Sequence, residues 1–192
     1  MLFDHITKFN KENTMKITKL QPKQWSDVKE IYLEAFPKCE RKPFLSLKRS
    51  VKKGKAIIYT ATEDSQLLGF VAVMPYKNMV MVDYLAISGK IRSKGTGSLI
   101  MKEICEIYSD KKIVLLIEKI DDSAENSEQR VARRRFYIKN GFTSSDIFIE
   151  GVSGNMEILN YGEKVTEQEY LSLHEHALGK LFFRLSKISI VK

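Results

Sequence analysis

The sequence predicts an α+β domain: a mixed, mostly antiparallel sheet with one central parallel pair and helices on both faces. Two observations carry this prediction. Three β-rich runs at 56–62, 67–74 and 79–87 are separated by polar turns alone, as in an antiparallel meander. A later unbroken apolar run, 113–117, follows a helical segment and is typical of a strand buried on both faces beside a parallel neighbour.

The segment before the meander is expected to form one strand and two helices. Residues 16–20 are a short β candidate, and apolar residues then recur at helical spacing over 25–36 until Pro37 ends the pattern. A weaker helical pattern spans 44–51 and leads into a basic run. These elements come before the first strand of the meander.

The elements after the meander alternate between helices and strands. A glycine-rich turn opens a helix over 97–109, and an arginine-rich helix ends at Gly141, which can supply the left-handed residue that a helix end favours. Two strands are expected at about 142–150 and 155–161. A capping box then predicts a single C-terminal helix over about 166–190.

Length and composition are those of one folded, water-soluble domain. The chain has 192 residues, of which 43% are hydrophobic and 29% charged. No apolar run approaches the roughly 20 residues of a membrane span, and the N-terminus lacks the pattern of a secretory signal, so we expect a cytoplasmic protein without a membrane partner. Residues 1–14 are interpreted as an extension and 15–192 as a single domain.

Charge, cysteines and histidines exclude several classes of function. The net charge is +8, but the basic residues are scattered and no nucleic-acid-binding motif accompanies them, so nucleic acid is not expected as the main partner. Cys39 and Cys105 stand alone, and Cys105 falls on the expected buried face of a helix. The three histidines have no metal-ligand spacing; we interpret them as surface residues and expect no metal.

The strongest motif lies between the strand 83–87 and the helix that follows it. It reads Arg-Ser-Lys-Gly-Thr-Gly over 92–97, and its glycines let backbone N–H groups approach an anion at the positive end of the helix dipole. Lys90, Arg92 and Lys94 would add charge-assisted contacts to phosphate. The alternative is a plain glycine-rich connector, and the motif is neither a Walker loop nor a complete dinucleotide fingerprint.

Together with a second motif, this one resembles the signatures of the GNAT acetyltransferase superfamily. The first signature of that family is Arg or Gln, two residues, Gly, one residue, then Gly or Ala, and an aliphatic residue corresponding to Ile87 ends the strand before it. The run ARRRFYIKNGF at 132–142 resembles the second signature. The resemblance covers about 16–161 and agrees with the order of elements given above.

The resemblance implies a binding site for acetyl-CoA as co-substrate. The pantetheine arm would lie in a V-shaped gap between strands 80–87 and 113–118, and the pyrophosphate would sit on the glycine-rich turn. The implied cofactor contacts are the backbone of Leu85, Ala86 and Ile87, and then Arg92, Ser93, Lys94, Gly95, Thr96, Gly97 and Ser98.

The resemblance also implies catalytic residues. Tyr137 takes the position of a tyrosine whose hydroxyl donates to the departing CoA sulfur; without the resemblance, a core tyrosine would be the simpler reading. Two carboxylates are candidate general bases: Asp83, four residues before Ile87 on the same expected strand face, and Glu118 at the end of its strand. Either could instead be a solvated strand-end carboxylate or an ion-pair partner.

The arginine-rich helix departs from the family pattern. Arg130 replaces an asparagine that commonly contacts CoA, and Arg133 replaces a frequent alanine. The arginines at 130 and 133–135 could reach CoA phosphates, yet a charge run on a helix is more often a solvated face. The acidic stretch 121–128 would favour a cationic amine if it lies near the acceptor site; the alternative is an ordinary solvated loop.

Two functions follow from these observations. The first is an N-acetyltransferase that moves the acetyl group of acetyl-CoA to a primary amine of a small molecule or a protein by direct attack. The second is a non-catalytic acyl-CoA-binding or nucleic-acid-associated module with the same fold. The apolar and basic tail at 188–192 is compatible with capping the sheet or with a homodimer.

Overall fold

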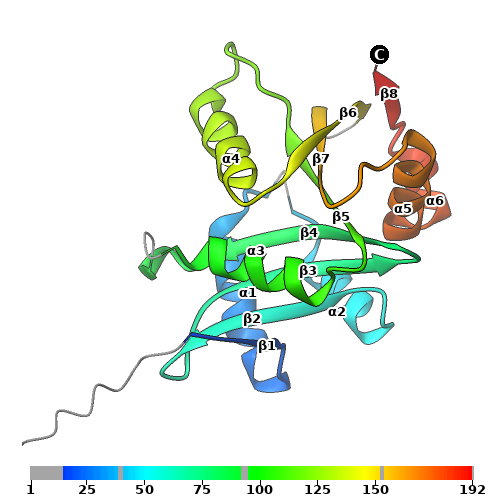
Figure 1. Ribbon diagram of the computed structural model, residues 1–192. Coiled ribbons are helices and arrows are strands. Elements are labelled where there is room, and N and C mark those ends of the chain that lie inside the picture. Colours follow the sequence, from blue (N-terminus) through cyan, green and yellow to red (C-terminus); the bar gives the residue numbers. More distant parts are fainter. Residues whose placement is uncertain (1–14, 39–40, 92–94, 152–153, 192) are drawn as a thin grey trace, which may run out of the picture.

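The structure, a computed structural model, describes residues 15–38, 41–91, 95–151 and 154–191 (Figure 1). Within these residues eight strands form one sheet in the order β1-β2-β3-β4-β5-β7-β6-β8. Every neighbouring pair is antiparallel except β4 and β5, as the sequence predicts. The strands are β1 (Lys16–Lys19), β2 (Ile57–Glu63), β3 (Gln66–Tyr76), β4 (Met79–Ile87), β5 (Lys112–Glu118), β6 (Thr143–Gly151), β7 (Gly154–Tyr161) and β8 (Ser189–Val191).

Helices cover both faces of the sheet. In Figure 1, α3 lies in front of β3 and β4 and α1 lies behind them, while α4 stands near β5 to β7. The α-helices are α1 (Trp25–Ala35), α2 (Phe44–Lys52), α3 (Thr96–Ile107), α4 (Ser127–Lys139), α5 (Glu167–Leu178) and α6 (Lys180–Leu185). Two 3-10 turns, η1 (Pro22–Gln24) and η2 (Gly89–Ile91), precede α1 and follow β4.

The alternation of side chains along the central strands divides the core between the two faces. On β3, Val71 and Val73 pack with α3, whereas Phe70 and Ala72 pack with α1. A third cluster, around Tyr170 of α5, covers the end of the second face. Cys105 of α3 is 5% exposed, which confirms its expected place on the buried face, and burial raises the pKa of its thiol to about 11.

The C-terminal segment differs from its prediction as one helix. Gly179, with φ 80° and ψ 151°, breaks the helical pattern between α5 and α6. This conformation is open to glycine because glycine has no side chain. The chain then turns back, and β8 pairs with β6 through Phe148↔Val191, Ile149↔Ile190 and Glu150↔Ser189. The tail therefore extends the sheet.

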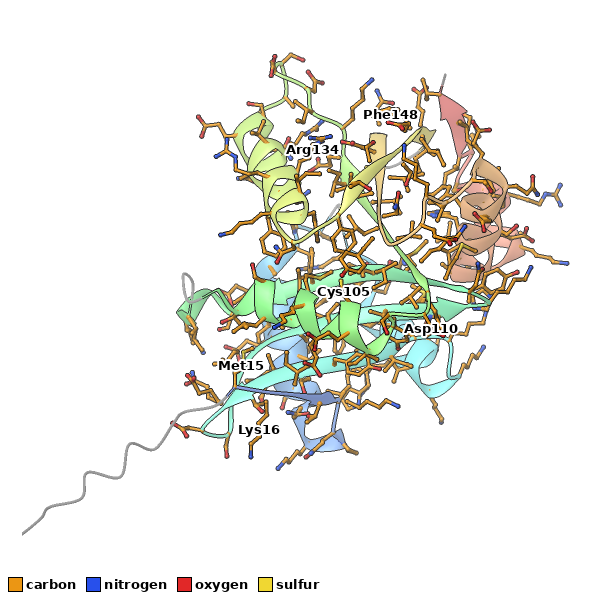
Figure 2. All side chains as sticks on the ribbon, in the orientation of Figure 1. Met15, Lys16, Cys105, Asp110, Arg134 and Phe148 are labelled. Carbon is orange, nitrogen blue, oxygen red and sulfur yellow. The ribbon has the colours of Figure 1, made fainter. Side chains whose placement is uncertain are left out.

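A buried ion pair fastens α4 to the sheet. Arg134, labelled in Figure 2, donates to both carboxylate oxygens of Glu157 on β7, through Nε at 2.8 Å and Nη2 at 3.2 Å. The side chain of Glu157 is 5% exposed and that of Arg134 is 35% exposed. This contact fixes the face of α4 that carries Phe136 and Tyr137 against the core.

Candidate functional site

The parallel strands β4 and β5 pair over part of their length and then separate. Their register runs from Met79↔Lys112 to Val82↔Leu115 and goes no further. Beyond it, β4 stays paired with β3 and β5 stays paired with β7. From Asp83 to Ile87 the edge of β4 facing β5 thus has no strand partner among the described residues. The strands thus separate where the resemblance to the GNAT family implies a V-shaped gap.

A β-bulge at Asp83 marks the point of separation. The register of β4 against β3 shifts from Val73↔Val82 to Ala72↔Tyr84, so Asp83 is the extra residue. In a regular strand Val82 and Tyr84, two residues apart, would point to the same face of the sheet. Because of the bulge, Val82 packs on the α3 side and Tyr84 packs on the α1 side. Simple alternation, which would place Asp83 and Ile87 on one face, therefore does not hold here.

The start of α3 lies at the open end of this gap. Gly95 caps the helix with a left-handed φ of 73°, and helix formation leaves the first backbone N–H groups of α3 without partners in the helix. Thr96 is buried, at 4% exposed, and Ser98 is partly exposed. Arg92, Ser93 and Lys94, the other predicted phosphate contacts, lie outside the described residues.

The two sequence signatures meet in space. A Cβ placed on Gly97 would lie 3.2 Å and 3.3 Å from ring atoms of Phe136 and 3.8 Å from a side-chain carbon of Ile87. Glycine therefore lets α3 approach α4 and the end of β4 closely. Gly141 ends this part of the chain with φ 86°, the left-handed conformation that its position after the arginine-rich helix predicts.

Tyr137 is half-buried beside Phe136 and Phe142, with ring centroids 5.1 Å and 5.7 Å away. Burial raises the pKa of Tyr137 to about 12, although the positive charge of Arg133 lowers it. Its hydroxyl has no hydrogen-bond partner among the described residues, in which every buried polar side-chain atom does have one. The hydroxyl is therefore protonated at neutral pH.

Glu118 is held by donors from α4 and the loop before it. Its carboxylate accepts from Arg133 at 2.6 Å and from Asn126 at 3.1 Å and 3.2 Å, and Arg130 lies 3.3 Å away. Two guanidinium groups, those of Arg130 and Arg133, thus share this one carboxylate. This geometry favours the ion-pair role for Glu118 over the role of general base.

The same contacts account for most of the arginine run on α4. Arg130 and Arg133 bind Glu118, and Arg134 binds Glu157, while Arg135 is exposed. Lys90, also expected near phosphate, pairs at 3.0 Å with Glu30 on α1, and both side chains are largely exposed. The hydrogen bond and charge of Glu30 raise the pKa of Lys90.

A cavity of about 500 Å³ opens on the face opposite α3. The segment between α1 and α2, the strands β4 to β7 and the helices α5 and α6 all contribute to its walls. Asp83 lines it and binds Lys42 through both carboxylate oxygens, at 2.9 Å and 3.0 Å. The acidic stretch 121–128 does not contribute to this lining.

Sequence reasoning missed the contribution of the C-terminal helices to this cavity. His174, expected at the surface, lines the cavity, and burial lowers its pKa to about 4. Its place four residues after the core residue Tyr170 on a helix was the available signal. His176 is half-buried and stacks on Tyr76 at 4.4 Å, and His5 lies outside the described residues.

The described ranges contain neither a cluster of metal ligands nor a membrane-spanning helix. No group of three or more His, Cys, Asp or Glu residues there is placed to hold a metal ion. No helix in the same ranges is long and apolar enough to cross a bilayer.

The chain is similar to known acetyltransferases. Residues 54–144 match the family model described as "Acetyltransferase (GNAT) domain". A protein of the GNAT family from Bacteroides thetaiotaomicron has a similar structure: the TM-score is 0.68 and the identity 18%, over 88% of this chain and 98% of that one. A comparison with curated proteins finds no significant match.

Two further solved structures share the fold. A GNAT family acetyltransferase from Elizabethkingia anophelis with acetyl-CoA bound has a TM-score of 0.58 and 16% identity, over 80% of this chain and 100% of that one. The ribosomal-protein-S18-alanine N-acetyltransferase from Escherichia coli has a TM-score of 0.60 and 13% identity, over 80% of this chain and 99% of that one.

Proposed function

Because residues 54–144 of this chain belong to the GNAT acetyltransferase family and the chain has the GNAT fold, we propose that the protein transfers the acetyl group of acetyl-CoA to a primary amine. The amine belongs to a small molecule or to a protein. The transfer is direct, without an acetylated enzyme as intermediate.

The observation that carries this proposal is the opening between β4 and β5. A site that suits the diphosphate lies on one face of the sheet at this opening, and a cavity lies on the other. The N-terminus of α3 and the ring of Phe136 lie on one face, and the cavity beside Asp83 lies on the other. A thioester threaded through the opening would hold its diphosphate at α3 and present its acetyl carbon to an amine in the cavity. Ligands commonly bind beyond the carboxyl ends of parallel strands in this way.

The residues present fit the coenzyme. Unpaired N–H groups at the start of α3 suit a diphosphate, and the free edge of β4 at Leu85, Ala86 and Ile87 suits the amides of the pantetheine arm. One N–H group of that edge would also polarise the thioester carbonyl. Such a preorganised donor typically lowers the barrier by about 3 kcal/mol.

The reaction balances with the groups at hand. The amine nitrogen attacks the acetyl carbon, the C–N bond forms, and the C–S bond breaks to release the thiolate. The phenol of Tyr137 stays protonated because its pKa is about 12, and it donates a hydrogen bond to the leaving sulfur. The proton released by the amine passes to a carboxylate or to water in the cavity.

Asp83 and Glu118 differ in their suitability to receive that proton. Both carboxylates are held in ion pairs, Asp83 by Lys42 and Glu118 by two arginines of α4, but only Asp83 lines the cavity among the described residues. We expect Asp83→Asn to lower kcat/KM by about tenfold or more and Glu118→Gln to leave it within about threefold. Initial rates with one amine at several pH values would check this. A larger loss in Glu118→Gln would make Glu118 the base.

The proposed function is tested by free-thiol release from acetyl-CoA in the presence of a panel of amines. We expect thiol release to depend on the amine and to match the amount of acetylated product. Uptake of acetyl-CoA without turnover of any amine would favour a non-catalytic acyl-CoA-binding module instead.

A further inference from the structure

We infer that the acceptor is an amino acid with an apolar side chain, and that Arg41 and His174 bind its carboxylate. This inference rests on the proposed function, because it assigns the acceptor of the same site. It comes from the charges, hydrogen-bond donors and apolar walls of the cavity beside Asp83.

The charged side chains of the cavity favour an anionic group on the ligand. Arg41, Lys42 and Asp83 are the side chains with a full charge among its described lining residues, so the lining has an excess of one positive charge. Both oxygens of Asp83 are already bound by Lys42. A polycationic acceptor would meet uncompensated positive charge here, whereas a carboxylate would neutralise it.

Arg41 has hydrogen-bond donors to spare, and its segment is fixed. Its Nη1 donates to the carbonyl oxygens of Leu33 and Phe36, both at 2.9 Å, which leaves three of the five guanidinium N–H groups without a partner among the described residues. The neighbouring backbone of Lys42 accepts from Tyr32 at 2.9 Å and donates to Tyr84 at 3.2 Å. These contacts fix the segment of Arg41, a residue that lines the cavity, before a ligand arrives.

His174 supplies a neutral donor through a defined tautomer. The fully buried Tyr170 has one hydrogen-bond partner for its hydroxyl in the described residues, Nδ1 of His174 at 3.0 Å. We assign the donor role to the phenol, because Nδ1 is the one acceptor for its O–H in the described residues. The imidazole proton is therefore on Nε2.

His174 is one of the residues that line the cavity. Nε2 has no hydrogen-bond partner in the ranges described, and we infer that it donates to the ligand in the cavity. Burial keeps the imidazole neutral at physiological pH. Such a neutral N–H donor can bind a carboxylate oxygen of the ligand, but it cannot accept a hydrogen bond from a ligand ammonium group.

The remaining walls suit an apolar side chain. Met81, Leu116, Met156 and Phe182 line the cavity from four different elements, and its volume of about 500 Å³ is in the range of small-molecule sites. An amino acid could place its carboxylate at Arg41 and His174, its side chain against these walls, and its amine toward the opening at Asp83.

Binding to the CoA-loaded protein tests this inference without turnover. Calorimetry would compare L-phenylalanine, L-methionine and L-leucine with phenethylamine, L-phenylalanine amide and spermidine. Because a charge-assisted contact at a cavity is worth about tenfold or more in affinity, we expect L-phenylalanine to bind at least about tenfold more tightly than phenethylamine and the amide. Equal binding of either analogue, tighter binding of spermidine, or no binding of any amino acid would overturn the inference.

Three variants locate the contact. Arg41→Gln and His174→Asn should each reduce the preference for L-phenylalanine over phenethylamine, while Lys102→Gln, which removes an exposed charge on α3, should leave it unchanged. His174→Asn keeps an acceptor for Tyr170 but removes the group at Nε2, so its fold is expected to persist. An unchanged preference in both Arg41→Gln and His174→Asn would contradict the assignment.

The results distinguish failure of the carboxylate site from failure of the proposed acetyl transfer. Thiol release with phenethylamine or spermidine, but no preference for amino acids, would support acetyl transfer and reject the carboxylate site. Tight binding of L-phenylalanine without thiol release from any amine would support the carboxylate site and reject acetyl transfer.

Discussion

Tyr137→Phe is expected to lower kcat by about 100-fold, the lower end of the contribution of a positioned proton donor, and to leave the Kd for acetyl-CoA nearly unchanged. The variant removes a single hydroxyl and keeps the ring contacts with Phe136 and Phe142. Stopped-time thiol assays for kcat and calorimetry for Kd would measure the two effects separately.

The pKa of Tyr137 adds a condition to this result. Burial raises the pKa of Tyr137 to about 12, so its hydroxyl keeps its proton up to about pH 10. Any change in kcat with pH below about pH 10 would therefore arise from another group. Tyr76→Phe serves as the matched control and should retain normal kcat. It removes a hydroxyl at the last residue of β3, at the end that pairs with Met79 and not at the end that pairs with Ile87. Equal activity of Tyr137→Phe and the parent protein would remove Tyr137 from the mechanism.

Arg134→Met is expected to destabilise the fold by about 3 kcal/mol, because it leaves the carboxylate of Glu157 buried without its partner. The value lies at the lower end for a broken buried pair, since the side chain of Arg134 is 35% exposed. For a domain of this size the melting temperature should fall by about 6–12 °C. Thermal unfolding followed by circular dichroism would measure the change.

Arg135→Met is the matched control, because Arg135 is exposed on the same helix. Its effect on stability should be within about 0.5 kcal/mol, as is usual for surface substitutions. If the two variants melted at the same temperature, the pair with Glu157 would not be what holds α4 on the sheet.

The element order was predictable because hydrophobic period and turn residues are local signals. The meander of β2, β3 and β4, the buried strand β5 and the left-handed end of α4 at Gly141 all follow from such signals. The break at Gly179 and the strand β8 were missed. Apolar residues continue at helical spacing across this glycine, and pairing of β8 with β6 depends on a distant part of the chain.

The site was predictable in part for the same reason. The signatures that include Gly97 and Phe136 are local, and their meeting in space agrees with the resemblance that they suggested. The bulge at Asp83 follows from register with β3, and the arginines around Glu118 come from another element. The cavity was not predictable, because it joins side chains from segments separated by more than 100 residues, such as Lys42 and His174.

We propose that CoA binds where β4 and β5 separate, with its diphosphate on the start of α3. A crystal structure of the protein grown with CoA tests it most directly. We expect diphosphate oxygens within hydrogen-bond distance of backbone N–H groups between Gly95 and Ser98, and the thiol in the gap beside Tyr137. CoA bound at any other place on the protein would contradict it.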